Sequence, residues 1–301
     1  MAIQKEIWIK DIRESLFPNN SFLAHAFNAD EYVEGGKVVH IPNAGAPSGI
    51  KKNRSSYPAD VTAREDIDLT FKLDEFTTNP IRIPHADTVE LSYDKRESVL
   101  RQDKAALQNA IAQSVLYSWL PSKEHCVRTT GKSVVAHTAK ATGNRKSFTK
   151  ADVAVAMKKF NAEDVPQEGR YLLLDAEMYQ QLLNDLTTQE SQAFFSCADV
   201  AKGVLGKLMS FNIMMRSTVA VYNTNLEKKA EDEAGNVNDC AAALAWHENS
   251  VCRAVGDVKA FEKEGDPTFY GDIYSFLARC GGRSMRSDVK GLLAIVQEQV
   301  E

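Results

Sequence analysis

One short stretch of the chain carries residue types typical of a nucleotide site. Residues 129–133 read TTGKS, and Gly131, Lys132 and Ser133 match the end of a phosphate-binding loop. Such a loop needs its first glycine five positions before Gly131, because its backbone amides wrap the phosphates; that position is Cys126, and no buried hydrophobic strand precedes it. The sequence therefore favours a flexible surface loop over 121–148 and leaves a nucleotide-binding enzyme using Gly131-Lys132-Ser133 as an alternative.

Metal-binding and redox residues are scattered. No two histidines lie four residues apart, and His125 beside Cys126 could hold a metal only with two distant partners, so we expect a surface pair. The cysteines contain no C-x-x-C pair, which indicates free thiols in a reducing cytoplasm. The other histidines are His25, His40, His85, His137 and His247, and the other cysteines are Cys197, Cys240, Cys252 and Cys280.

The sequence motifs of common enzymes are missing. There is no G-x-S-x-G elbow, no H-E-x-x-H and no G-x-G-x-x-G. For a chain of 301 residues this favours a structural or binding role, and we predict no catalytic residue, no cofactor and no metal.

Charged residues gather on two predicted loops. Lys51, Lys52 and Arg54 form a small basic tip, which we expect to meet an acidic patch on a protein neighbour rather than nucleic acid. Asp66 and Asp68 share one face of the strand that follows, and this is its solvent face. Residues 227–239, EKKAEDEAGNVND, predict a solvated loop whose carboxylates serve solubility.

The basic tip belongs to a long predicted hairpin. Residues 37–42 predict a strand after the turn Gly35-Gly36, residues 43–60 a polar tip, and residues 64–74 a returning strand with strictly alternating apolar residues. A lone hairpin is marginally stable in water, so its apolar face must lie on another surface, and if that surface is a second copy the hairpin is an assembly arm. The predicted assembly contacts are Lys51, Lys52, Arg54, Ile67, Leu69 and Phe71.

The second dominant element is a helix over residues 92–120, free of Gly and Pro until Pro121 ends it. Ser92 is a suitable N-cap. The apolar residues Leu100, Leu107, Ile111, Val115 and Trp119 form one stripe at helical spacing. The helix is long enough to act as a spine for elements from distant parts of the chain.

The rest of the chain predicts an amphipathic arm, an α/β region and a β-rich end. A helix over 3–17 forms the arm, and the end indicates a sheet packed beside the spine helix. A strand over 76–84 leads into that helix, and Phe194, Phe195 and Gly203 fall in a loop. The α/β region comprises helices over 149–160 and 176–186 and strands over 170–175 and 206–215. The end comprises strands over 241–247, 250–256, 258–263 and 270–280, a turn at Gly281-Gly282 and a strand over 291–296.

Composition narrows the protein class. Hydrophobic content of 44% and charged content of 26% are those of a globular protein, and the net charge of −5 argues against a dedicated nucleic-acid binder. No apolar run is long enough to span a membrane, and the N-terminus lacks the apolar core of a signal peptide.

The order of these parts resembles the major capsid proteins of tailed bacteriophages, which have the Hong Kong 97 type shell fold. The resemblance covers nearly the whole chain and includes GRYLLLD at 169–175, ALAWH at 243–247 and the closing strands with Gly281, Gly282 and Gly291. It implies an α+β fold with an N-terminal arm (1–35), an extended hairpin called the E-loop (36–84), a peripheral domain with the spine helix (85–125 and 237–301) and an axial domain (126–236).

The same resemblance implies a function. The chain would assemble as pentamers and hexamers into an icosahedral phage head in the host cytoplasm, contact packaged double-stranded DNA non-specifically, and meet portal and scaffolding or decoration proteins. No membrane would be involved. No long scaffolding segment precedes the arm, so scaffolding would come from another protein or be unnecessary. Lys51 and Lys52 lie where some relatives form a crosslink, but no catalytic glutamate can be assigned, so we expect none. An encapsulin-type compartment loaded with enzyme cargo is the alternative on the same fold.

Overall fold

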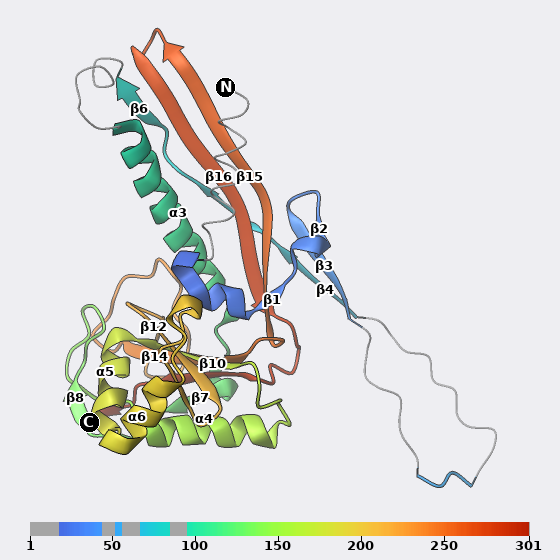
Figure 1. Ribbon diagram of the computed structural model, residues 1–301, viewed down its shortest axis with the longest axis vertical. Coiled ribbons are helices and arrows are strands. Elements are labelled where there is room, and N and C mark those ends of the chain that lie inside the picture. Colours follow the sequence, from blue (N-terminus) through green and yellow to red (C-terminus); the bar gives the residue numbers. More distant parts are fainter. Residues whose placement is uncertain (1–17, 44–51, 56–66, 85–94, 301) are drawn as a thin grey trace.

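A 25-residue helix, α3 (Lys95–Trp119), lies beside a long two-stranded ribbon and ends at a second unit built on a seven-stranded sheet (Figure 1). The computed structural model describes residues 18–43, 52–55, 67–84 and 95–300. The predictions for the arm helix over 3–17 and for the following residues lie outside this description: Lys51, Asp66, His85, Ser92 and the side chains of Ile67 and Leu100.

Helix α3 buries the stripe that its sequence predicts. The indole N–H of Trp119 donates to the Cys252 carbonyl at 2.9 Å. The helix ends at Trp119, shortly before Pro121, because proline cannot continue the backbone hydrogen bonding. The buried stripe comprises Leu107, Ile111, Val115 and Trp119.

The ribbon consists of β15 (Val251–Asp266) and β16 (Gly271–Ser284), the central pair of a five-stranded sheet. β1 (Phe27–Asn28) pairs with β15, while β5 (Asp74–Thr77) and β6 (Ile81–Pro84) pair with β16. The strands predicted over 250–256 and 258–263 are therefore one strand, which continues through a bulge between Val255 and Val258. The single strand predicted over 76–84 is wrong, since β5 and β6 are separated by residues that include Pro80.

The turn predicted at Gly281-Gly282 is also wrong. Both residues lie inside β16, paired with Ala254 and Arg253. A Cβ on Gly282 would lie 2.8 Å from both the indole nitrogen of Trp119 and a methyl group of Val115. Gly282 therefore permits close approach of the ribbon to α3.

The second unit is a seven-stranded sheet covered by helices. Its strand order is β11-β12-β10-β14-β17-β7, with β13 paired to β14. Tyr171 and Leu173 of β10 face the core shared with α3, while Leu172 and Leu174 face the core under the helices. The continuous apolar run of β10 follows from burial on both faces. The strands are β7 (Cys126–Arg128), β10 (Arg170–Asp175), β11 (Gly206–Leu208), β12 (Phe211–Arg216), β13 (Ala220–Tyr222), β14 (Cys240–His247) and β17 (Leu292–Val296).

Three helices accompany this sheet: α4 (Lys150–Ala162), α5 (Ala176–Asp185) and α6 (Thr188–Ser196). The helices predicted at 149–160 and 176–186 are confirmed within two residues. Phe194 and Phe195 lie in α6 rather than in a loop, and the capping box of Thr187 and Glu190 that begins this helix was visible as T-x-x-E.

Two further predictions are corrected in this unit. The strand expected over 206–215 is the hairpin β11–β12, whose turn residues Met209 and Ser210 both have positive φ. This backbone conformation normally favours Gly, Asn or Asp, so Met209 and Ser210 carry no turn signal that could be recognised from residue type. In addition, β14 and β17 belong to the seven-stranded sheet, so only β15 and β16 of the C-terminal strands lie in the sheet beside the spine helix.

The stretch 121–148 is not one flexible loop. It contains η3 (Lys123–His125), β7, β8 (Ser133–Val135) and β9 (Asn144–Lys146). β7 pairs with β17, and β9 pairs with both β8 and β18 (Gln299–Val300). Each of these strands has at most three residues, too few to show hydrophobic alternation, and backbone partners distant in the sequence hold them in place.

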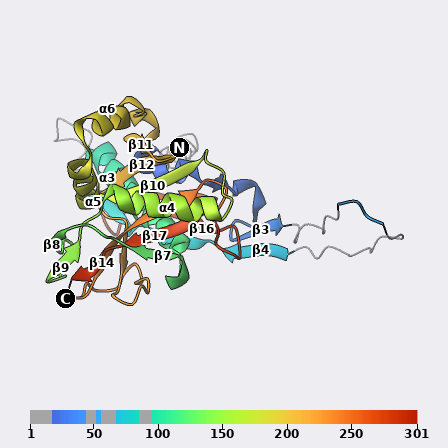
Figure 2. The same cartoon turned by 90° about the horizontal axis from the view of Figure 1, so that it is seen from below.

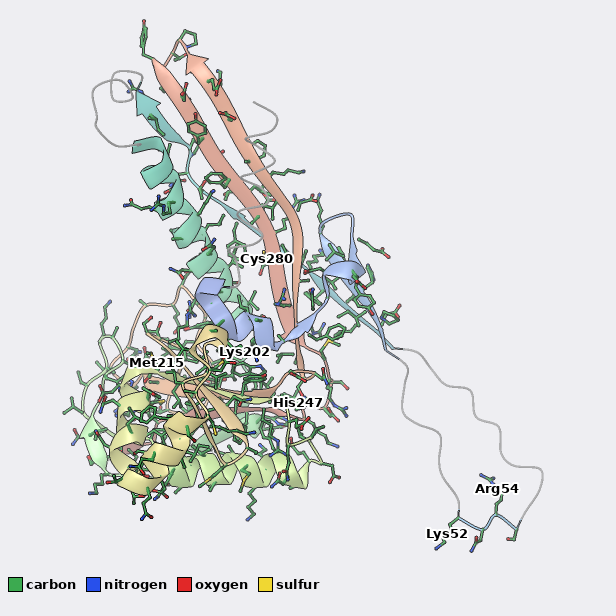
Figure 3. All side chains as sticks on the ribbon, viewed as in Figure 1. Lys52, Arg54, Lys202, Met215, His247 and Cys280 are labelled. Carbon is green, nitrogen blue, oxygen red and sulfur yellow. The ribbon has the colours of Figure 1, made fainter. Side chains whose placement is uncertain are left out.

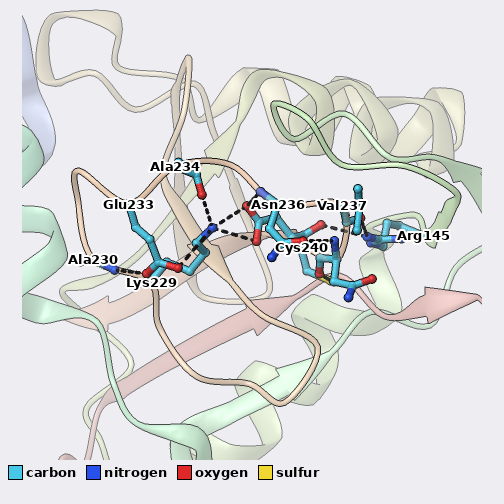
Figure 4. Close-up of polar contacts among 10 residues, drawn as sticks. Arg145, Lys229, Ala230, Glu233, Ala234, Asn236, Val237 and Cys240 are labelled. Carbon is cyan, nitrogen blue, oxygen red and sulfur yellow. Dashed lines mark hydrogen bonds and ion pairs between the residues drawn. The ribbon is translucent and has the colours of Figure 1, made fainter.

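The acidic loop 227–239 is anchored by a buried ion pair rather than fully solvated. Lys229 and Asp239 are 7% and 2% exposed, and the ammonium lies 2.8 Å from a carboxylate oxygen. The ammonium also donates to the Ala234 carbonyl, and the buried guanidinium of Arg145 donates to the Val237 and Asp239 carbonyls (Figure 4). The expectation that these carboxylates only serve solubility is therefore wrong for Asp239.

Candidate assembly surfaces

The predicted hairpin is present. β3 (Val38–Asn43) and β4 (Ile67–Lys72) are antiparallel and paired along six residues each. β2 (Val33–Glu34) adds a third strand through the turn at Gly35-Gly36. Figure 2 shows β3 and β4 leaving the body of the molecule side by side. The N-terminal segment η1 (Pro18–His25), β1 and η2 (Asp30–Tyr32) leads into this hairpin.

The base of the hairpin packs on the chain's own ribbon. Val39, Ile41 and Leu73 form a buried cluster with Ala29 and with Cys252 and Ala254 of β15. The predicted contact residues Leu69 and Phe71 are partly buried against this cluster. At the base of the hairpin, the surface that covers its apolar face therefore belongs to the same chain. Asp68 is exposed, as predicted.

Lys52 and Arg54, the described residues of the basic tip, lie far from both units (Figure 3). Lys52 and Asn53 are exposed and Arg54 is half-buried. Figure 3 places Lys52 and Arg54 on the segment most distant from the two sheets. At this distance neither side chain contacts the two units of its own chain.

The outer end of the ribbon exposes aromatic residues that sequence reasoning did not identify. Phe261 and Phe269 are each 49% exposed and Tyr270 is 78% exposed. Phe269 and Tyr270 lie in the connection between β15 and β16, and Tyr270 has a φ of +48°. Exposed aromatic pairs in a turn are typical of contact surfaces, so the adjacent Phe-Tyr was the available signal.

The TTGKS stretch does not form an open phosphate cradle. The Gly131 N–H donates to the Ser147 carbonyl, and the Thr130 hydroxyl and backbone N–H both donate to the Asp152 carboxylate. A Cβ on Gly131 would lie 2.4 Å from the Ser147 carbonyl oxygen. Neighbouring backbone and a carboxylate therefore occupy the positions that phosphate oxygens would need. This geometry opposes the nucleotide-binding alternative.

His125 and Cys126 do not form a metal centre with other described residues. Among the residues that the structure describes, no group of three or more His, Cys, Asp or Glu is arranged to hold a metal ion. The Cys126 thiol donates to the Ser122 carbonyl at 3.4 Å, and burial raises its pKa to about 11, which keeps it protonated. All five cysteines are free.

One histidine pairs with a buried carboxylate. His137 Nε2 lies 2.8 Å from Asp175, whose other carboxylate oxygen accepts from the Met178 backbone N–H at the start of α5. Asp175 is 5% exposed. Because this carboxylate caps a helix, its environment is explained by the fold. Asp175 ends the stretch GRYLLLD, so the sequence gives it a local structural role.

Membrane insertion by a helix finds no support: within the described ranges, none of the helices combines the length and hydrophobicity needed to cross a bilayer. No protein-family model and no curated protein matches the chain.

Solved structures do match the chain over most of its length. The capsid structure of the cyanophage P-SCSP1u is 19% identical with a TM-score of 0.60, and the match covers 90% of this chain and 85% of that one. The head structure of the Helicobacter pylori bacteriophage KHP40 is 12% identical with a TM-score of 0.61, covering 94% and 90%. A virus-like particle from Pyrococcus furiosus is 11% identical with a TM-score of 0.56, covering 97% and 99%.

These matches identify the class of fold. The spine helix, the ribbon beside it, the separate sheet unit and the projecting hairpin together form an α+β fold of the kind found in these structures. More particularly, it is the Hong Kong 97 type fold, and the predicted fold is confirmed.

Proposed function

We propose that the protein is a major capsid protein that assembles into an icosahedral phage head around double-stranded DNA. The observation that carries the proposal is the hairpin, which projects its basic tip away from both units of its own chain (Figure 3). The matches to the cyanophage and KHP40 structures cover 85% and 90% of those chains, which supports a role for the entire described architecture in the shell.

Assembly follows from contacts between unlike surfaces of identical copies. Such contacts form closed rings when the rotation between neighbours closes, and we infer pentamers and hexamers. The seven-stranded unit would act as the axial domain, and α3 with its five-stranded sheet as the peripheral domain. In this proposal β14 and β17, which lie within the range 237–301 expected for the peripheral domain, would belong to the axial domain. Interfaces of several thousand Å² per subunit are typical of obligate assemblies and would combine many modest contacts.

The proposed assembly contacts lie on the hairpin. Lys51, Lys52 and Arg54 would meet acidic groups of a neighbour, and Ile67, Leu69 and Phe71 would contribute apolar surface. Leu69 and Phe71 already pack partly on their own chain, so only their remaining exposed surface would serve this contact.

The remaining parts of the proposal concern partners and location. Portal and scaffolding or decoration proteins would complete the head, DNA would be contacted non-specifically, and assembly would take place in the host cytoplasm. We propose no enzymatic activity. The net charge of −5 would limit adhesion of the inner surface to DNA during packaging.

An encapsulin-type compartment is the second candidate. It is favoured by the virus-like particle from Pyrococcus furiosus, of which this chain covers 99%. Its TM-score of 0.56 does not exceed the 0.60 and 0.61 of the phage structures, so this match does not displace the phage proposal. A co-purifying enzyme, rather than DNA, inside particles would favour the compartment.

Deletion of residues 45–60 tests the proposal. Electron microscopy and light scattering of the intact chain, with scaffolding supplied by co-expression if needed, should show rings or closed shells. The deletion variant should give a folded subunit, with an unchanged circular dichroism spectrum, that forms no shells. A variant that substitutes only Asp68, which is exposed on the outward face of β4, with Asn is the control and should assemble. Normal shells from the deletion variant would contradict the proposal.

A further inference from the structure

The base of the hairpin is inserted into the ribbon at a place where three glycines remove side-chain bulk. Leu73, the residue between β4 and β5, is 8% exposed. Its backbone N–H donates to the Lys37 carbonyl at 2.8 Å, which closes the hairpin. Leu73 thus belongs to the hairpin by its backbone and to the ribbon by its side chain.

Gly256 and Gly281 lie next to the two methyl groups of the Leu73 side chain. A Cβ on Gly256 would lie 2.7 Å from one methyl carbon of Leu73 and 2.8 Å from the Gly36 carbonyl oxygen. A Cβ on Gly281 would lie 3.1 Å from the other methyl carbon. Gly256 lies in the bulge of β15, where the extra residue bends the strand locally.

A polar contact holds the other side of the base. Gly36 has a φ of +66°, and a Cβ there would lie 2.5 Å from the Asp257 carboxylate carbon. Arg279 donates to Glu75 at 2.9 and 2.6 Å, and its third nitrogen lies 3.4 Å from Asp257. Arg279 therefore links the bulge in β15 to the strand that follows the hairpin.

We propose that Leu73, Gly36, Gly256 and Gly281 form a seat that fixes the direction in which the hairpin leaves the subunit. Rotation of the hairpin about its base would force Leu73 out of the space between two glycines and would separate Gly36 from Asp257. This inference rests on the proposed function in one respect: in an assembled shell, a fixed hairpin direction sets the angle between neighbours and hence the particle diameter.

Gly256→Ala is the direct perturbation, because its new methyl group meets the carbonyl oxygen of Gly36, which cannot move without the turn. Gly281→Ala is milder, since it meets only the end of a flexible side chain at 3.1 Å. Gly265→Asn is the matched control: Gly265 lies in the same strand, no atom lies within 4 Å of a Cβ there, and asparagine tolerates its φ of +61°.

Hydrogen exchange of the full-length subunit is the first readout. Amides of residues 38–41, 43 and 67–72 should exchange about tenfold faster in Gly256→Ala and by a smaller factor in Gly281→Ala. In Gly265→Asn they should exchange within about twofold of wild type. Amides of β10 and β14 should be unchanged and report that the variants are folded. Unchanged exchange of β3 and β4 in both alanine variants would overturn the seat, whether or not the protein forms shells.

Particle diameter by electron microscopy is the second readout. Gly256→Ala should give a broader range of diameters than wild type, and Gly265→Asn should not. Faster exchange with an unchanged single diameter would leave the seat established and overturn its control of shell size. Failure of the wild-type chain to assemble under any condition would refute both the proposed function and the size control, while the exchange result would still decide the seat.

Discussion

Replacing Trp119 with Phe should destabilise the free subunit by about 1.5–2.5 kcal/mol. The substitution removes a hydrogen bond to the Cys252 carbonyl, which contributes about 0.5–1.5 kcal/mol. It also leaves a cavity costing about 1 kcal/mol, at the low end for large-to-small changes, because the smaller ring still fills most of a site that is 0% exposed.

Trp119 contacts aromatic residues from elements other than α3. Its ring lies 6.0 Å from that of Phe22 in the N-terminal segment and 5.9 Å from that of Trp246 in β14. The side chain therefore connects the helix, the segment before the hairpin and the seven-stranded sheet. We expect one cooperative unfolding transition for wild type and variant, with equal dependence on urea.

Urea unfolding followed by circular dichroism measures the change, and Phe261→Ala is the control. Because Phe261 is 49% exposed and buries only about half of its side chain, its truncation should cost about 1 kcal/mol, less than the loss expected for Trp119→Phe. A loss below about 0.5 kcal/mol for Trp119→Phe would refute the packing argument. A transition that splits in two would refute the claim that Trp119 couples the two units.

Gly282→Ala and Trp119→Phe together form a double-mutant cycle. The added Cβ would lie 2.8 Å from the Trp119 indole nitrogen, an atom that phenylalanine lacks. The cost of Gly282→Ala, about 1–3 kcal/mol in wild type, should therefore be smaller in the Trp119→Phe background. Additive costs would contradict the direct contact.

Two further predictions concern charged groups. Lys229→Met should destabilise the subunit by about 3 kcal/mol, because it leaves the buried Asp239 carboxylate without its cation, and a loss below about 1 kcal/mol in urea unfolding would contradict this. The contacts of Glu190 with Thr187 and Lys150 lower its pKa to about 2, so its stabilising contribution is complete above its ordinary pKa near 4.5 and is lost as the pH falls toward 2. Glu190→Gln should accordingly flatten the decline in thermal stability between those pH values, and an unchanged acid profile would argue against this contact.

Patterns of apolar residues close together in the sequence predicted several helices and strands correctly. The α3 stripe, the buried run of β10 and the alternation in β4 specify which faces are buried, and the structure agrees. Gly281-Gly282 shows the limit of such patterns. A pair of glycines indicates a turn when only neighbours in sequence are considered. Here a Cβ on Gly282 would meet atoms of Cys252, Trp119 and Val115, and a Cβ on Gly281 would meet Leu73, all of them distant in the sequence.

Only part of the candidate assembly surfaces could be predicted from the sequence, for a similar reason. The hairpin and its basic tip follow from strand and turn signals. The own-chain partners of Leu69 and Phe71 do not, because β15 begins at Val251, far along the chain. The burial of Lys229 and Asp239 was missed because a charged sequence is normally solvated, and pairing becomes visible only in the fold.

In the proposed shell, the base and the tip of the hairpin would have different roles in assembly. Leu69 and Phe71 already gain part of their burial inside the subunit, so their removal would weaken the subunit and its contacts together. Lys52 and Arg54 lie far from the chain's own domains (Figure 3), so in the proposed shell changes there would act on contacts with neighbours alone. The base of the hairpin also contains the seat formed by Leu73 and the three glycines. We therefore expect the base to set the direction of the hairpin and the tip to attach the hairpin to a neighbouring subunit. Tip deletion should therefore abolish shells without unfolding the subunit, whereas substitutions at the base should change hairpin order first and particle size as a consequence.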